Sequence, residues 1–170
     1  MQKQNKFLSL EEVKEKASYC YSYENGDYKY KIKDGYYHLI RNGKDLLEGK
    51  EATWCYSHDN ADYHYETKDG YYHLIRNGKN LLKGINATWC WSFENGDYTY
   101  KIKEGYYHLI RSGVDLLQSK NAVDCWSYEN GDYHYQTECG KSIYVKNACK
   151  KNWMLAIIIL IIIVISFQGK

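Results

Sequence analysis

The sequence lacks proline altogether and has no large excess of charge of either sign. Its 170 residues include 23 Lys and Arg against 21 Asp and Glu, which gives a formal net charge of +2. Proteins that bind nucleic acids usually gather basic residues on one face, and a nearly balanced chain has little surplus charge for such a patch. We therefore expect no nucleic-acid partner.

Motifs that carry out catalysis or bind metal ions are also missing. The sequence has no G-x-S-x-G nucleophile turn, no glycine-rich phosphate loop and no H-E-x-x-H metal motif. Its closest pair of cysteines, Cys139 and Cys149, is ten residues apart, whereas zinc sites usually draw on C-x₂₋₄-C pairs. We predict a protein that is not an enzyme and has no cofactor and no bound metal.

The N-terminal segment, residues 1–16, lacks the apolar core of a secretion signal, so we do not expect export by that route. It does carry a helix start, because Ser9 can cap a helix and Glu12 follows three residues later. Apolar residues at helical spacing then predict a short helix over residues 10–17 that covers the first repeat.

Repetition is the strongest feature that the sequence does have. Cys20, Cys55, Cys90 and Cys125 are each 35 residues apart, within closely matching surroundings such as ASYCYSYENGDY and ATWCWSFENGDY. The chain therefore divides into four tandem repeats, at residues 17–51, 52–86, 87–121 and 122–149, of which the last diverges after Gly140. The 20 tyrosines favour half-buried β-strands in these repeats.

Three turn signals divide each repeat into four strands. In the first repeat they are Asn25-Gly26, Asp34-Gly35 and Asn42-Gly43, and such pairs are typical of two-residue type I′ hairpin turns. They predict an up-and-down meander with strands over residues 18–24, 27–33, 36–41 and 44–48.

Two details of these turns matter later. In the second repeat Ala61 replaces the first turn glycine, so either that turn differs or a left-handed alanine costs about 1 kcal/mol. The acidic residues that follow the first turn of each repeat are interpreted as turn chemistry; they are Asp27, Asp62, Asp97 and Asp132.

Alternation along the strands gives each repeat an aromatic face and a small-residue face. In the third repeat, Trp89, Trp91 and Phe93 alternate with small residues that include Cys90 and Ser92. Small residues let backbones approach closely, so we expect the small-residue face, with its one cysteine per repeat, to pack against the adjacent repeat. One meander alone cannot bury such faces, but stacked repeats can.

The predicted fold is therefore all-β: tandem four-stranded meanders with a 35-residue period, arranged as an open stack or as a propeller-like array. The period is shorter than the ~40–45 residues of common propeller blades, which favours the open stack.

The stretch KDGYYHLIRNGKDLL resembles the bacterial WG (KWG-type) repeat, whose core reads D-G-x-x-G-x-I-D-x-x-G-K. The matching pairs in the first repeat are Asp34-Gly35, Leu39-Ile40 and Gly43-Lys44. The Trp-Gly pair of that family is replaced by Tyr37-His38, and Arg41 stands where the family often has Asp. The resemblance covers most of residues 17–149. It implies a β-repeat binding or scaffold module without family-wide catalytic residues.

An uncharged apolar run, Trp153–Phe167, lies within the last segment, residues 150–170. As a helix the run spans about 22 Å and the flanking residues extend it toward a thin bilayer, whereas a strand of this length would be unusual. We predict a single transmembrane helix rather than a buried core segment. Two lysines before the run and one after it favour a tail-anchored protein with residues 1–149 in the cytoplasm. Cys149, just before the run, is a candidate for S-palmitoylation.

Two sets of repeated side chains are candidates for binding. The tryptophans of the aromatic face are either core residues or a platform for a ligand; they are Trp54, Trp89, Trp91 and Trp126. The histidines of the YYH strands either line a ligand site or are copied strand residues, and the lack of a carboxylate partner favours the second; they are His38, His73 and His108.

These observations predict a non-catalytic, membrane-anchored β-repeat protein that acts as a protein-interaction or scaffold module. The alternative is a carbohydrate- or cell-envelope-binding module that uses the aromatic face, because DGYYHLIRNG also resembles exported cell-wall-binding repeats with a G-x-Y-Y pattern.

Overall fold

The computed structural model describes residues 12–13, 16–32, 35–103 and 105–147, and within them it has fifteen strands in four sheets. The sheets are made of β1 (Tyr19–Ser22), β2 (Tyr28–Lys31), β3 (Tyr37–Arg41) and β4 (Lys44–Asp45); β5 (Ala52–Ser57), β6 (Tyr63–Thr67), β7 (Tyr72–Arg76) and β8 (Lys79–Asn80); β9 (Ala87–Ser92), β10 (Tyr98–Ile102), β11 (Tyr107–Arg111) and β12 (Val114–Asp115); and β13 (Ala122–Ser127), β14 (Tyr133–Thr137) and β15 (Ser142–Val145).

Each repeat forms its own antiparallel meander, as the sequence predicts. Strands pair in chain order within every sheet, for example Cys20 with Tyr30 and Tyr30 with His38. The fourth strand of each complete repeat is only two residues long, shorter than predicted, and the fourth sheet has three strands.

The hairpin turns are of two kinds, and only one is the predicted type I′. Asn42 and Gly43 both have positive φ, 50° and 73°, as that turn requires. The first Asn-Gly turn is a three-residue loop in which only Gly26 has positive φ, and the prediction of type I′ there is wrong. The N–H of Gly26 donates to the carbonyl of Tyr23, and the N–H of Tyr23 donates to the carbonyl of Asp27.

Ala61 adopts this same left-handed position in the second repeat, with φ of 66°. Its N–H donates to the carbonyl of His58 and the N–H of His58 donates to the carbonyl of Asp62, so the turn is unchanged. Of the two alternatives that the sequence leaves open, the strained alanine is the one that occurs.

The core lies between consecutive sheets. Leu39 and Leu47 of the first repeat are buried against Ala52 and Cys55 of the second, and equivalent residues meet at the next two interfaces. Ala52 and Cys55 are both fully buried. The small-residue face is therefore a packing face between repeats, as the sequence predicts.

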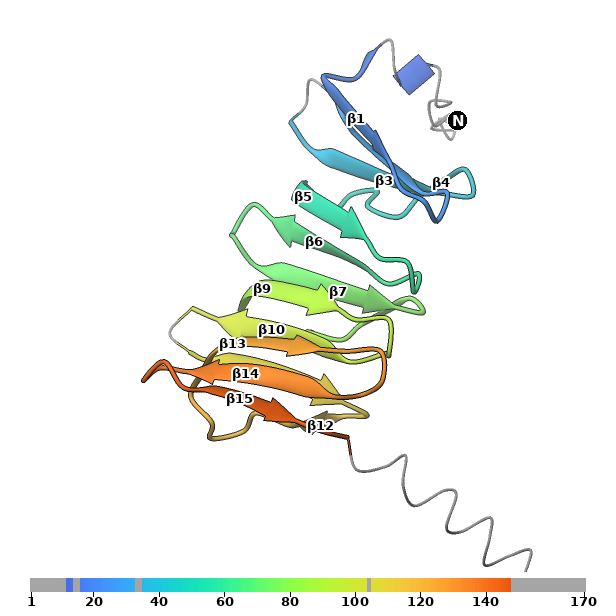
Figure 1. The fold of residues 1–170 in the computed structure, drawn as a ribbon. Helices are drawn as coiled ribbons and strands as arrows, with labels where there is room; N and C mark the ends of the chain where they lie inside the picture. The colour runs from blue at the N-terminus through green and yellow to red at the C-terminus, as the bar shows by residue number, and fades with distance from the viewer. Residues whose placement is uncertain (1–11, 14–15, 33–34, 104, 148–170) are drawn as a thin grey trace, which may run out of the picture.

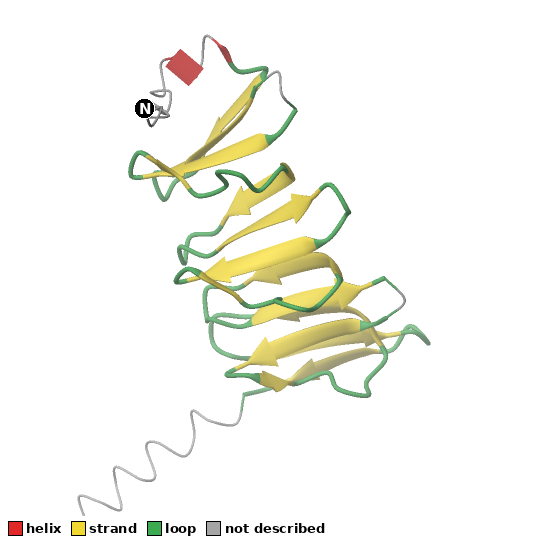
Figure 2. Cartoon of the chain, turned by 180° about the vertical axis from the view of Figure 1, so that it is seen from behind, coloured by secondary structure: helices red, strands yellow, loops and turns green. Residues whose placement is uncertain are grey.

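The repeats form an open stack in which each sheet packs on its neighbours along the chain (Figures 1 and 2). At the N-terminal end Val13 is fully buried against Tyr30 and Ile40, and the N–H of Ala17 donates to its carbonyl. At the other end, Trp126 and Tyr144 of the fourth sheet are 45% and 53% exposed. The four sheets that the structure describes are thus not closed into a propeller (Figure 1).

Several predicted features lie outside the described residues. They include residues 10–11 and 14–15 of the helix predicted over 10–17, the apolar run Trp153–Phe167 and Cys149. Within the ranges that the structure does describe, no helix is long and apolar enough to cross a membrane.

Candidate functional site

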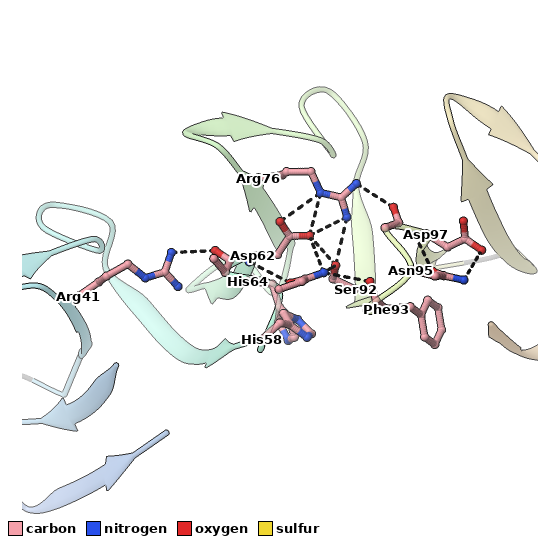
Figure 3. Close-up of polar contacts among 12 residues, drawn as sticks. Arg41, His58, Asp62, His64, Arg76, Ser92, Phe93, Asn95 and Asp97 are labelled. Carbon is pink, nitrogen blue, oxygen red and sulfur yellow. Dashed lines mark hydrogen bonds and ion pairs between the residues drawn. The ribbon is translucent and has the colours of Figure 1, made fainter. Parts of the chain in front are cut away.

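A polar network joins each sheet to the next. At the middle interface the buried carboxylate of Asp62 accepts hydrogen bonds from Nε and Nη2 of Arg76, the latter at 2.7 Å, and from the hydroxyl of Ser92 in the following repeat (Figure 3). Nη1 of Arg76 donates to the carbonyl of Gly96, also in the following repeat, at 2.8 Å. A buried charge needs such pairing, and here the pairing binds two repeats together.

Asn60 completes the network. Its side-chain amide donates to the hydroxyl of Ser92 at 2.9 Å and to the carbonyl of Phe93 at 3.0 Å. Equivalent contacts connect Asn25 to the second repeat and Asn95 to the fourth. The network therefore holds the end of the first strand in the second, third and fourth repeats, and with it the aromatic side chains that the strand carries.

The interpretation of the acidic residues as turn chemistry is therefore incomplete. Asp27, Asp62 and Asp97 are buried ion-pair partners of arginines in their own repeats, and each accepts a hydrogen bond from a serine of the next. The sequence does contain a signal for this network, because its Asn, Asp, Arg and Ser residues all recur with the 35-residue period. The period alone does not say whether a residue's partner comes from its own repeat or from the next.

Aromatic rings follow the first strands from repeat to repeat, and we call this row the aromatic ladder. Its members are Tyr21, Tyr23, Tyr56, His58, Trp91, Phe93, Trp126 and Tyr128. At each interface a ring of one repeat packs edge to face on a ring of the following repeat. The ring centroids are 5.3 Å apart for Tyr23–Tyr56, 4.7 Å for His58–Trp91 and 5.1 Å for Phe93–Trp126. The ladder both packs the repeats together and leaves ring surface exposed.

A groove of about 580 Å³ runs along the ladder over the second, third and fourth repeats. We call it the aromatic groove. It is lined by rings of Tyr56, His58, Trp91, Phe93, Trp126 and Tyr128 and by polar residues of the adjoining turns. Two of the predicted tryptophans, Trp91 and Trp126, are brought together here.

The other two tryptophans lie elsewhere. Trp54 packs beside His64, with ring centroids 5.0 Å apart, and Trp89 packs edge to face on Tyr107 at 5.4 Å. Neither lines the aromatic groove.

An acidic residue from each of three repeats forms the rim of the groove. Asp59, Glu94 and Glu129 are exposed and occupy equivalent positions in the turns after β5, β9 and β13. Hydrogen bonding to Glu129 and repulsion from its charge raise the pKa of Glu94. This acidic rim was not predicted, because its residues are unremarkable in a turn until the fold aligns them.

A buried pair of histidines lies at the second-repeat end of the groove. Nε2 of His58 and Nδ1 of His64 are 2.7 Å apart, and both side chains are buried. Desolvation lowers the pKa of His58 to about 4 and the pKa of His64 well below its usual value. Both rings are therefore neutral near pH 7.

Lys29 is buried among the same kinds of rings in the first repeat. Its ammonium donates to the carbonyl of Cys55 at 2.7 Å. It lies between 5.1 and 5.9 Å from the ring centroids of five aromatic residues, which are Tyr19, Tyr21, Tyr23, Tyr37 and Trp54. The equivalent positions of the second and third repeats hold His64 and Thr99.

Two of the three repeated histidines face a carboxylate, contrary to the expectation, whereas His73 lies 3.0 Å from the side-chain amide of Asn80. Nδ1 of His38 lies 2.7 Å from Asp45, and His108 has the same contact with Asp115. The ring of His38 stacks on Tyr30, with centroids 4.8 Å apart. Within the described part of the chain, no group of three or more His, Cys, Asp or Glu residues could hold a metal ion.

No protein-family model matches the sequence, and no curated protein matches it. Among solved structures, the chain is similar to the SAS-4 (dCPAP) TCP domain of Drosophila melanogaster, solved in complex with a proline-rich motif of Ana2 (dSTIL). The similarity has a TM-score of 0.26 and 16% identity, and covers 74% of this chain and 82% of that chain. At this TM-score the likeness supports no inference about function.

Proposed function

We propose that the chain is a protein-interaction module that binds an extended segment of a partner protein in the aromatic groove. The observation that carries the proposal is that one continuous groove receives aromatic rings and an acidic side chain from each of three successive repeats. Aromatic anchors in a groove supply most of the energy of peptide recognition, and a repeated surface suits an extended ligand.

Rigidity of the groove supports this role. The Asp62–Arg76–Ser92 contact and the amide of Asn60 tie the second repeat to the third, and Asn60 and Ser92 themselves line the groove. Because these groups are already held in place, a ligand would not have to order them, and less binding energy is lost.

A binding role suits the groove better than a catalytic one. Its histidine, His58, is hydrogen-bonded to His64 and neutral, and its carboxylates lie on an exposed rim rather than beside a nucleophile. General acid–base chemistry needs a titratable group poised near neutral pH and within reach of the reacting atoms.

We further propose, from the sequence alone, that the apolar run Trp153–Phe167 holds the repeats at a membrane with residues 1–149 in the cytoplasm. Protease treatment of sealed cells would test this, since cleavage of residues 1–149 from outside would contradict the orientation.

Binding of the full-length protein to arrays of 12-residue peptides of varied charge, and in parallel to glycan arrays, tests the main proposal. We expect peptide binding that is lost when Trp91→Ala and Trp126→Ala are combined. Trp89→Ala is the matched control, because it removes a tryptophan outside the groove, and should leave binding intact. Peptide binding that survives in the double variant, or capture of glycans without peptides, would contradict the proposal.

A further inference from the structure

We propose that the aromatic groove recognises lysine side chains of its partner, with two lysines placed three residues apart along an extended segment. The inference rests on the proposed function and names the chemical class of its ligand. Three features of the groove carry it: the ring composition of its wall, the charge of its rim and the spacing of its repeats.

The chain itself shows what the rings of the ladder can hold. Lys29 packs its ammonium among five aromatic rings and a backbone carbonyl. Two of those rings, Tyr21 and Tyr23, occupy the positions that Trp91 and Phe93 hold in the groove. Aromatic faces attract ammonium groups through their quadrupoles, and tryptophan does so most strongly. The groove thus contains counterparts of two of the five rings that surround a lysine ammonium in the first repeat.

The charge of the groove favours the same ligand. Its rim carries Asp59, Glu94 and Glu129, and none of the described residues that line it is Lys or Arg. The hydrogen bond between the carboxyl groups of Glu94 and Glu129, together with the repulsion between their charges, raises the pKa of Glu94. A cation placed between two such carboxylates removes the repulsion and adds attraction to both. A lysine ammonium over the rings would lie beside this rim.

The spacing of the repeats sets the spacing of the lysines. Stacked sheets are about 10 Å apart, and three residues of a polyproline II segment span about 9 Å and make one full turn, so that every third side chain faces the same way. The acidic residues recur once per repeat, at Asp59, Glu94 and Glu129, and the carboxyl groups of Glu94 and Glu129 are joined by a hydrogen bond. Two lysines separated by two residues would therefore place one ammonium beside Asp59 and the other beside the Glu94–Glu129 pair.

Fluorescence anisotropy with labelled peptides and the full-length protein tests this inference. The first probe is a 12-residue peptide of repeated Ser-Thr-Lys. In the second probe each lysine is replaced by norleucine, which keeps the alkyl chain without the charge. In the third probe each lysine is replaced by glutamate. We expect the lysine peptide to bind at least roughly tenfold more tightly than the norleucine peptide. The glutamate peptide should not bind detectably.

Variants of the rim separate local from general charge effects. Glu94→Gln combined with Glu129→Gln should weaken the lysine peptide by about tenfold and leave the norleucine peptide unchanged. Glu48→Gln combined with Glu51→Gln removes the same charge from residues that do not line the groove, and should change affinity little.

Equal affinity for the lysine and norleucine peptides, or equal effects of the two charge pairs, would overturn the lysine inference while leaving peptide binding in place. Absence of binding by any peptide on the arrays would contradict the proposed function as well. Self-association of the protein that blocks the probe would show that a second copy, rather than a lysine-bearing partner, occupies the groove, and would also overturn the inference.

Discussion

The hydroxyl of Ser92 in the third repeat donates a hydrogen bond to the carboxylate of Asp62, thirty residues earlier in the second repeat. Both residues are buried, at 4% and 3% exposure. This contact, repeated at the interfaces on either side, converts four small meanders into one stack. It also places the rings of successive first strands in contact.

Replacing Ser92→Ala should destabilise the stack by about 1–3 kcal/mol, because a buried carboxylate and the amide of Asn60 both lose a partner. The measurement is urea unfolding followed by circular dichroism. Ser22→Ala is the control, since Ser22 occupies the same repeat position in the first unit and is exposed. Equal losses in the two variants would show that the contact with Asp62 contributes nothing.

Replacing Arg76→Ala should cost more, about 3–5 kcal/mol, because Asp62 would remain buried without its ion-pair partner. Arg76→Lys should recover only part of the loss, since an ammonium cannot contact both carboxylate oxygens of Asp62 and the carbonyl of Gly96 as the guanidinium does. Urea unfolding measures both variants. A lysine variant as stable as wild type would contradict the importance of this geometry.

Replacing Ala61→Gly should stabilise the protein by about 1 kcal/mol, because a glycine adopts positive φ without strain. The reciprocal change, Gly96→Ala, puts alanine at the equivalent turn of the third repeat, where nothing lies within 4 Å of the added Cβ. It should destabilise by a similar amount. Thermal unfolding of the two variants tests the pair, and shifts of the same sign would refute the explanation.

Acid should destabilise the second repeat through its buried histidines. Burial lowers the pKa of His58 from 6.5 to about 4; the charge of Asp62 opposes this shift and the charge of Arg76 adds to it. The pKa of His64 is also lowered, by burial and by the charges of His58 and Lys29. Because these histidines bind protons less readily in the folded state than in the unfolded state, protonation does not reduce the stability of the fold above pH 6.5. As pH falls from 6.5 toward 4, the free energy of unfolding decreases, by up to about 3 kcal/mol for His58.

The variant His58→Phe with His64→Thr separates this effect from the titration of carboxylates. It installs the residues that the third repeat carries at the equivalent positions, Phe93 and Thr99. The difference in unfolding free energy between wild type and variant, measured from pH 7 to pH 4, should change in favour of the variant as pH falls. A constant difference over this range would show that the two histidines do not cause the acid sensitivity.

The sequence predicts much of the fold because the relevant signals are local. A 35-residue period, strand alternation and turn glycines are enough to place the meanders, their order and the small-residue face with Cys55 and Ala52. The form of the first turn was predicted wrongly, because an Asn-Gly pair is compatible with more than one hairpin loop and only the backbone distinguishes Gly26 from Gly43.

The candidate site was predicted only in part. Trp91 and Trp126 were candidates from sequence, but so were Trp54 and Trp89, which occupy equivalent strands and do not line the groove. Trp54 and Trp89 share one position of the repeat, and Trp91 and Trp126 share the position two residues later. Only the packing of one sheet on the next shows that the second position lies along the groove.

By itself, then, the sequence determined the repeat, its strands and the faces that they bury, because these depend on residues close together along the chain. Only the tertiary structure decided that Asp62 pairs with Arg76 and holds Ser92 of the next repeat, and that rings and carboxylates of three repeats share one groove. Both outcomes depend on how one sheet lies on the next. That arrangement is set by packing across interfaces and is not visible in any single repeat.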